Sequence, residues 1–238
     1  MSALPQRIAL GDAEVTLIVS RHPRARRFVL RVDERGEAVE LVLPRWGSLR
    51  EANRFLEKNR GWLEQRLKDL PPRVAFAEGS EIPLLGVIHR IRHRHDARKR
   101  GAVWIERGEI HVAGEAAHLP RRLKDFLRER ARTELTARAH DLAAKLGRKV
   151  AGIRLGDGKS RWGSCSAKGG LAFSWRLILA PEDVLHYVVA HEVAHLVEMN
   201  HGPRFWKLVE TLAPGYSKAG ADARGWLRRN RARLLRFG

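Results

Sequence analysis

The chain has 238 residues, enough for one large domain or two modest ones. With 44% apolar and 31% charged residues, and no run near the ~18 apolar residues of a spanning helix, its composition excludes a transmembrane protein. The net charge of +19 is spread out, with +8 over residues 1–100 and +11 over residues 101–238. It therefore indicates either a generally cationic surface or non-specific contact with nucleic acid.

Two further features of the sequence bear on the location of the protein and on how it could bind a metal. The N-terminus meets acidic residues at Asp12 and Glu14 and lacks the blocks of a secretory signal, so we expect a cytoplasmic protein. Cys165 is the single cysteine, which excludes an intrachain disulfide and a cysteine-based zinc cage. Any metal must therefore bind through other side chains, and the eleven histidines are the candidates.

The first part of the chain is predicted to be mostly β-structure. Short β-branched or aromatic runs predict strands at residues 15–19, 28–32 and 39–43. A capping box opens a predicted helix over residues 49–67, and two prolines end it. Further strands are predicted within residues 82–112. We therefore expect residues 1–118 to form a mostly β part with one helix.

The second part, residues 119–238, is predicted to be mostly helical. Apolar residues at helical spacing predict helices over residues 119–146, from residue 181 onward, over 203–212 and over 222–235. A glycine- and serine-rich loop, residues 156–170, and a strand, residues 171–179, separate the first two of these helices.

The helix that follows Pro181 contains the sequence H-E-V-A-H. On a helix, His191 and His195 are one turn apart on the same face, so both imidazoles can reach one metal ion. Glu192, next to the first histidine, can take a proton from a water that the metal acidifies. The alternative is a pair of hydrogen-bonded core histidines.

A third histidine, His201, follows six residues after His195 and precedes Gly202-Pro203, which can turn the chain back. Three histidines with one water form the open tetrahedral arrangement of catalytic zinc. The alternative for His201 is an exposed loop histidine. The spacing equals that of metzincin peptidases, but Glu198 stands where those enzymes have glycine and no Met-turn follows, so we reject that assignment.

Six segments of the chain together resemble the YgjP-like family of SprT-related zinc metallopeptidases. They are RWGSCS (161–166), LAFSWRLILAP (171–181), YVVAHEVAHL (187–196), NHGPRFW (200–206), RARRFVLRV (24–32) and NRGWLEQRL (59–67). The resemblance implies an α+β fold: a gluzincin-like minimal metallopeptidase domain with an N-terminal mostly β part. It also implies a zinc-dependent hydrolase that binds one Zn²⁺ ion, with other divalent metals as alternatives.

The same resemblance assigns roles to single residues. His191, His195 and His201 would be the metal ligands and Glu192 the general base. The strand before the zinc helix commonly borders the cleft in such enzymes, which makes Ser174, Trp175 and Arg176 candidates to face the substrate. The alternative for these three residues is ordinary strand alternation, with the aromatic side chains in the core.

Three more residues are candidates for substrate binding. Tyr216 could polarise a scissile carbonyl, although a packed tyrosine is the alternative. Lys159 and Arg161, in the glycine-rich loop, could bind an anionic group.

Three functions remain in competition. A metallopeptidase acting on peptides or proteins is the leading one. The alternatives are a metal-dependent nucleoside triphosphate (UTP-type) pyrophosphatase, an activity ascribed within the YgjP-like group, and a nucleic-acid-associated SprT-like protease. No membrane partner is expected.

Overall fold

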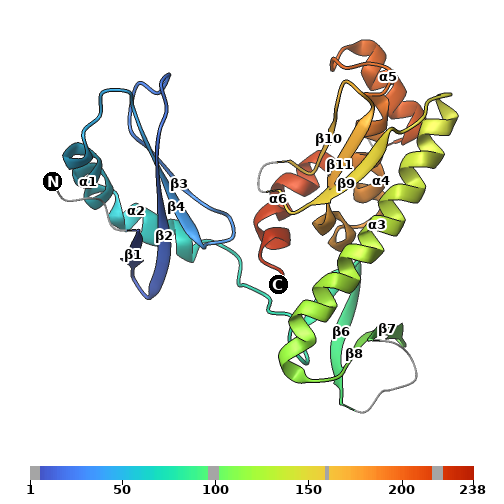
Figure 1. The fold of residues 1–238 in the computed structure, drawn as a ribbon, viewed down its shortest axis with the longest axis horizontal. Helices are drawn as coiled ribbons and strands as arrows, with labels where there is room; N and C mark the ends of the chain where they lie inside the picture. Colours follow the sequence, from blue (N-terminus) through green and yellow to red (C-terminus); the bar gives the residue numbers. More distant parts are fainter. Residues whose placement is uncertain (1–5, 96–101, 159–160, 216–221) are drawn as a thin grey trace. The chain divides into compact units, whose positions relative to one another are not determined.

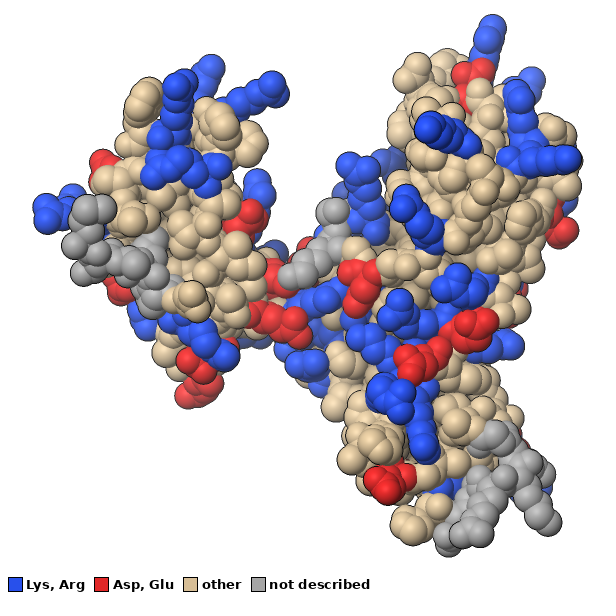
Figure 2. All heavy atoms as spheres, in the orientation of Figure 1, with Lys and Arg blue, Asp and Glu red and all other residues tan. Residues whose placement is uncertain are grey.

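The computed structural model describes residues 6–95, 102–158, 161–215 and 222–238. Within them, six α-helices and three mixed β-sheets form an α+β protein (Figure 1). The chain divides into two compact units, Met1–Pro72 and Arg73–Gly238, and basic side chains are spread over both (Figure 2). Every helix in the described ranges is too short or too polar to traverse a bilayer.

The N-terminal unit is one four-stranded sheet covered by two short helices. Its strands are β1 (Arg7–Leu10), β2 (Ala13–Arg21), β3 (Val29–Val32) and β4 (Ala38–Leu43), in the order β1-β2-β4-β3, with β2 parallel to β4. The helices are α1 (Leu49–Lys58) and α2 (Arg60–Lys68). Leu17 and Leu41 of the sheet pack with Leu56 and Leu63 of the helices in a small core.

The single helix predicted over residues 49–67 is in fact two. Ser48 and Glu51 form the predicted capping box at the start of α1. At Asn59 the backbone leaves the helical region, and the Asn59 side-chain amide donates to the Phe55 carbonyl 2.7 Å away. The side chain thus satisfies an end carbonyl of α1, and α2 begins at the next residue.

A second four-stranded sheet begins the C-terminal unit. Its strands are β5 (Glu81–Leu84), β6 (Val87–Arg94), β7 (Val103–Glu106) and β8 (Glu109–Ala113), in the order β5-β6-β8-β7. This order and these strand directions repeat those of the N-terminal sheet. The repeated topology was not predicted from the sequence.

The long helix α3 (Leu119–Lys145) packs against this second sheet. Ile91 and Ile110 of the strands share one buried core with Leu123 and Leu127 of the helix. The structural division after Pro72 therefore differs from the expected one after residue 118, because these strands have no core of their own without α3.

The third sheet and three further helices complete the C-terminal unit. The sheet contains β9 (Gly152–Gly156), β10 (Gly163–Cys165) and β11 (Gly170–Ser174), in the order β10-β11-β9. The helices are α4 (Glu182–Ala194), α5 (Pro203–Leu212) and α6 (Ala223–Leu235), close to their predicted bounds. The predicted strand 171–179 ends at Ser174, and the short 3-10 helix η2 (Trp175–Leu179) follows.

Candidate metal centre

Helix α4 carries two of the three histidines on one face. Pro181 precedes the helix, and the acidic side chains of its first turn complement the positive end of the helix dipole. The helix is nearly all buried, which agrees with its apolar sequence. It ends at Ala194 with His195 as its last capping residue, so the chain is free to turn and return His201 just before α5 begins.

The three histidines that the sequence singled out lie together. One nitrogen from each of His191, His195 and His201 lies within 4.8 Å of the others. The Nε2 atoms of His191 and His201 are 3.1 Å apart. Two nitrogens that bind one zinc ion tetrahedrally lie about 3.3 Å apart, so this spacing fits a shared metal ion.

Neighbouring groups set the orientation of these rings. His195 Nδ1 lies 3.0 Å from the backbone carbonyl of Glu198 and can donate its proton there, which leaves Nε2 free to bind a metal. The ring of Phe205, fully buried, lies 4.5–4.9 Å from each of the three imidazoles and forms one wall behind them. The backbone carbonyl of Glu198 therefore orients the His195 ring.

Burial favours the neutral forms of His191, His195 and Glu192. Desolvation, followed by the charges of His195 and His201, lowers the pKa of His191 to about 4. Burial also lowers the pKa of His195. The pKa of Glu192 is raised to about 7 by burial, against a smaller opposing effect of Arg161. Neutral imidazoles are the form that binds metal, and a carboxyl with a pKa near 7 suits a general base at neutral pH.

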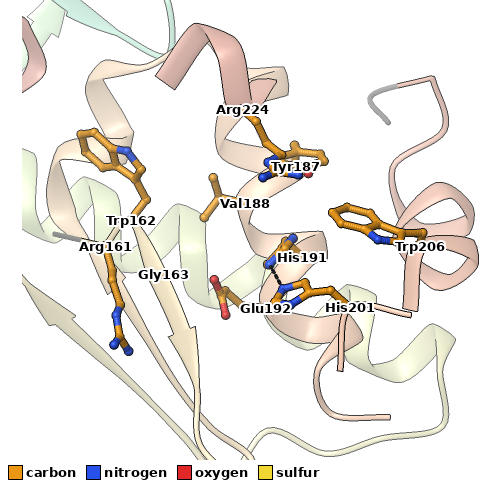
Figure 3. A pocket seen from close by; sticks show the side chains of 10 residues that line it. All are labelled: Arg161, Trp162, Gly163, Tyr187, Val188, His191, Glu192, His201, Trp206 and Arg224. Atoms are coloured by element: carbon orange, nitrogen blue, oxygen red, sulfur yellow. Dashed lines mark hydrogen bonds between the residues drawn. The ribbon is translucent and has the colours of Figure 1, made fainter. Parts of the chain in front are cut away.

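A cleft of about 580 Å³ opens over His191 and His201, whose rings face each other in it (Figure 3). Its lining comes from the segment at β10 and from helices α4, α5 and α6. The lining residues are Arg161, Trp162, Gly163, Tyr187, Val188, His191, Glu192, His201, Trp206 and Arg224.

One wall of the cleft is the edge strand β10, whose backbone passes very close to Glu192. A Cβ atom at Gly163 would lie 2.6 Å from Cγ and Oε1 of Glu192. Only glycine allows this approach without moving the carboxylate. β10 pairs with β11 on one side, and no strand of the described residues pairs with its other edge.

The structure does not place Ser174, Trp175 and Arg176 in this cleft, which corrects the expectation for them. All three are buried, and β11 lies between β10 and β9, so it has no free edge for a peptide. Arg176 Nε donates to Asp157 Oδ1 at 2.6 Å, and its Nη1 donates to the carbonyls of Leu234 and Phe237. Its role is structural, since it ties η2 to the C-terminal helix.

The other predicted substrate residues have different outcomes. Arg161 lines the cleft, and its role in substrate binding stays a prediction. Lys159 and Tyr216 lie outside the described residues. Burial raises the pKa of the Cys165 thiol, which agrees with the absence of any sequence feature for an activated nucleophile.

Several residues of the cleft were not predicted from the sequence. Tyr187 is four residues before His191, so helical spacing alone puts it on the same face, and this signal was available. Trp206 lies in the NHGPRFW segment, which also contains His201. Arg224, which lies over the Trp206 ring at 5.7 Å, comes from α6, and nothing in the sequence indicated it.

Comparison with known proteins agrees with this geometry. A UTP pyrophosphatase of Escherichia coli (strain K12) is 42% identical over 48 residues, which are 20% of this chain and 29% of that relative. The crystal structure of the metallopeptidase zymogen of Pyrococcus abyssi abylysin is 24% identical, covering 45% of this chain and 97% of that one, with a TM-score of 0.34, a likeness too distant to support a conclusion. The model of the YgjP-like metallopeptidase domain matches residues 26–230. This match spans most of the sequence, and the chain belongs to the YgjP-like family.

Proposed function

We propose that this protein is a zinc-dependent peptidase. The observation that carries the proposal is the convergence of three imidazoles beside a buried carboxylate, in a cleft bordered by the free edge of a β-strand. His191, His195 and His201 would hold the ion, and their donor set and spacing fit zinc. The bound ion would acidify water and polarise a carbonyl.

The side chains of the cleft supply the remaining parts of the reaction. Glu192 would accept a proton from the attacking water and pass it to the leaving amine, a transfer suited to its pKa of about 7. Burial raises the pKa of Tyr187, so its phenol stays protonated and can act as a hydrogen-bond donor within the cleft.

An extended peptide would bind along β10. Its backbone can pair with the free edge of this strand, as a peptide pairs with an exposed sheet edge in β-augmentation. Trp162 and Trp206 supply apolar surface for side chains, and Arg161 and Arg224 favour acidic ones. The edge strand in this proposal is β10, in place of the strand 171–179 considered from the sequence.

The decisive variant is Glu192→Gln, measured on the zinc-loaded protein with fluorescently labelled casein. We expect cleavage to fall about 10²–10⁴-fold because the general base is lost, while the zinc content stays unchanged. Cleavage at the unaltered rate in a zinc-loaded Glu192→Gln protein would disprove the proposed role.

The proposed role of His201 as the third metal ligand can be tested separately. His201→Ala should lower the zinc bound per chain, whereas His140→Ala, at an exposed position on α3, should not. Full zinc occupancy in His201→Ala would remove this residue from the site.

Hydrolysis of a nucleoside triphosphate with release of pyrophosphate is the second candidate function. Two arginines, Arg161 and Arg224, line the cleft and could bind phosphates, and the 48-residue match is to a protein named UTP pyrophosphatase. The same zinc-loaded sample should therefore be offered UTP beside casein. Pyrophosphate release with intact casein would favour this second function and exclude the first.

A further inference from the structure

A second surface, far from the histidines in sequence, combines arginine with an exposed indole. Trp46 is 84% exposed and occupies the corner of a turn that the Gly47 amide closes by donating to the Pro44 carbonyl. The guanidinium of Arg45 lies 4.7 Å from the centre of the Trp46 ring. Single exposed apolar residues are common, so the exposure alone indicates nothing.

The two chain segments that meet at the Trp46 turn are rich in arginine. Residues 20–32 and 41–50 together contain seven arginines and no acidic residue. Residues 1–72 carry 14 basic and 10 acidic side chains, so outside these two segments acidic residues outnumber basic ones by ten to seven. The charge of the N-terminal unit is therefore concentrated, even though that of the whole chain is spread out. We call these two segments the arginine end of the unit.

The fold brings the two segments together. β2 and β4 are parallel, so the chain leaves both strands at the same end of the sheet (Figure 1). Arg21 donates to the carbonyls of Pro44 and Arg45, at 2.9 and 2.6 Å. Figure 2 shows blue side chains gathered at the upper end of this unit.

Packing beneath the turn holds it in place. A Cβ atom at Gly47 would lie 2.8 Å from Cζ of Phe28, so the turn packs tightly on the other segment. Phe28 stacks on Phe55 of α1 at 5.6 Å. The indole is thus presented on a fixed support, which lowers the entropic cost of using it to bind a partner.

Four of the seven arginines of this end are available to a ligand. Arg24, Arg26, Arg27 and Arg50 are exposed, and none of them forms an ion pair with a carboxylate of the described residues. Guanidinium groups bind phosphates bidentately, and an exposed indole stacks on a base of any identity.

From this arrangement we propose that the arginine end of the N-terminal unit binds single-stranded nucleic acid, with Trp46 stacked on a base and the arginines on neighbouring phosphates. A base inside a duplex does not offer its face to an indole, which favours a single strand. An anionic membrane is less suited, because Leu49 is the one exposed large apolar residue of α1, and interfacial helices insert a broad apolar face.

The test uses the full chain and fluorescein-labelled oligo(U) and oligo(dT) of 20 nucleotides, with fluorescence anisotropy over a series of salt concentrations. Trp46→Ala should weaken binding about fivefold or more, the loss of one stacked base. Trp62→Ala is the matched control: Trp62 is half-exposed in the same unit but lies on α2, so this variant should bind like the parent.

A second pair of variants tests how much the arginines contribute to nucleic-acid binding. The double variant Arg26→Glu, Arg27→Glu should weaken binding at least tenfold. It should also reduce the slope of log K against log salt by about 1.4, because the counterions released by two phosphate contacts are lost. Arg66→Glu with Lys68→Glu changes the net charge equally on exposed positions of α2 and should have a much smaller effect.

The outcomes separate this proposal from its rivals and from the peptidase. Equal losses in both charge variants would overturn it in favour of diffuse attraction. Trp46-dependent binding to phosphatidylserine vesicles, without binding to either oligonucleotide, would overturn it in favour of a membrane. Glu192→Gln should bind the oligonucleotides normally, so failure of either proposal leaves the other standing.

Discussion

At the scale of single residues, the contact between Gly163 and Glu192 sets the geometry of the cleft. The strand backbone approaches the carboxylate so closely that any side chain at position 163 would displace it. The displaced atoms belong to the Glu192 side chain, so the fold can adapt while the carboxylate changes its position.

Gly163→Ala should therefore reduce peptide hydrolysis at least tenfold with little change in zinc content or stability, because general-base catalysis depends on hydrogen-bond reach. Kinetics on casein, metal analysis and urea unfolding would measure the three quantities. Gly152→Ala is the control, since Gly152 belongs to the same sheet and has open space where its Cβ would lie. Full activity in Gly163→Ala would contradict the assigned position of Glu192.

The raised pKa of Glu192 predicts a pH-dependent stability of the metal-free protein. With a pKa of about 7 in the folded state and 4.5 as its ordinary value, this carboxyl binds more protons folded than unfolded between these pH values. Its favourable contribution is complete below pH about 4.5 and is lost as the pH rises through 7, by at most about 3 kcal/mol.

Glu192→Gln stays neutral, so its stability advantage over the parent should grow from pH 5 to pH 8 in the presence of a chelator. Urea unfolding at the two pH values measures this difference. The lowered pKa of His191 acts in the opposite direction, since its protonation destabilises the fold as the pH falls from 6.5 toward 4. It does so in both proteins, so it largely cancels in the comparison. A difference that does not vary with pH would show that Glu192 has an ordinary pKa.

At the scale of elements, the short helix η2 explains why three predicted substrate residues are not in the cleft. After Ser174 the chain stops pairing as a strand, and all five residues of η2 are buried. The charged side chain of Arg176 can be buried here because Asp157 and two carbonyls of the C-terminal segment accept its hydrogen bonds. Its side chain joins three elements that are far apart in sequence.

Arg176→Met should destabilise the C-terminal unit by about 2–4 kcal/mol, because Asp157 and two carbonyls lose a buried, charged partner. Urea unfolding would measure the loss. Arg233→Met, at an exposed position of α6, is the control and should change stability little. If Arg176→Met instead raised KM for casein at unchanged stability, the substrate-facing interpretation of Arg176 would be restored.

At the scale of the whole molecule, the chain is two units with separate cores. The core of the N-terminal unit draws on residues 8–67, and that of the C-terminal unit on residues 74–237. All three candidate metal ligands belong to the second unit. A metal ion should therefore stabilise the second unit and leave the first unchanged.

Hydrogen exchange with and without zinc would test this division. At a free zinc concentration 100-fold above the dissociation constant, the core amides of residues 73–238 should gain about 2.7 kcal/mol of protection. Amides of residues 6–72 should keep the same exchange rates. Equal protection of both units would show that they unfold together.

Much of the candidate site was predictable from the sequence, because its key residues are neighbours in the chain. His191, His195 and Glu192 lie within five residues on one helix, whose spacing fixes which side chains share a face. His201 follows after a short turn, so it too returns to the same place. Most helix bounds were predictable for the same reason, since apolar spacing and capping residues act locally, although the break between α1 and α2 at Asn59 was not predicted.

What the tertiary structure alone decided depends on residues far apart in the chain. The pairing of β10 at a sheet edge, the presence of Arg224 in the cleft and the burial of Arg176 arise from contacts between remote segments. The division after Pro72 has the same origin, because a core is shared by whichever elements pack together and not by neighbours in sequence. Local spacing therefore fixed the metal-binding helix, while non-local packing decided which surfaces surround it.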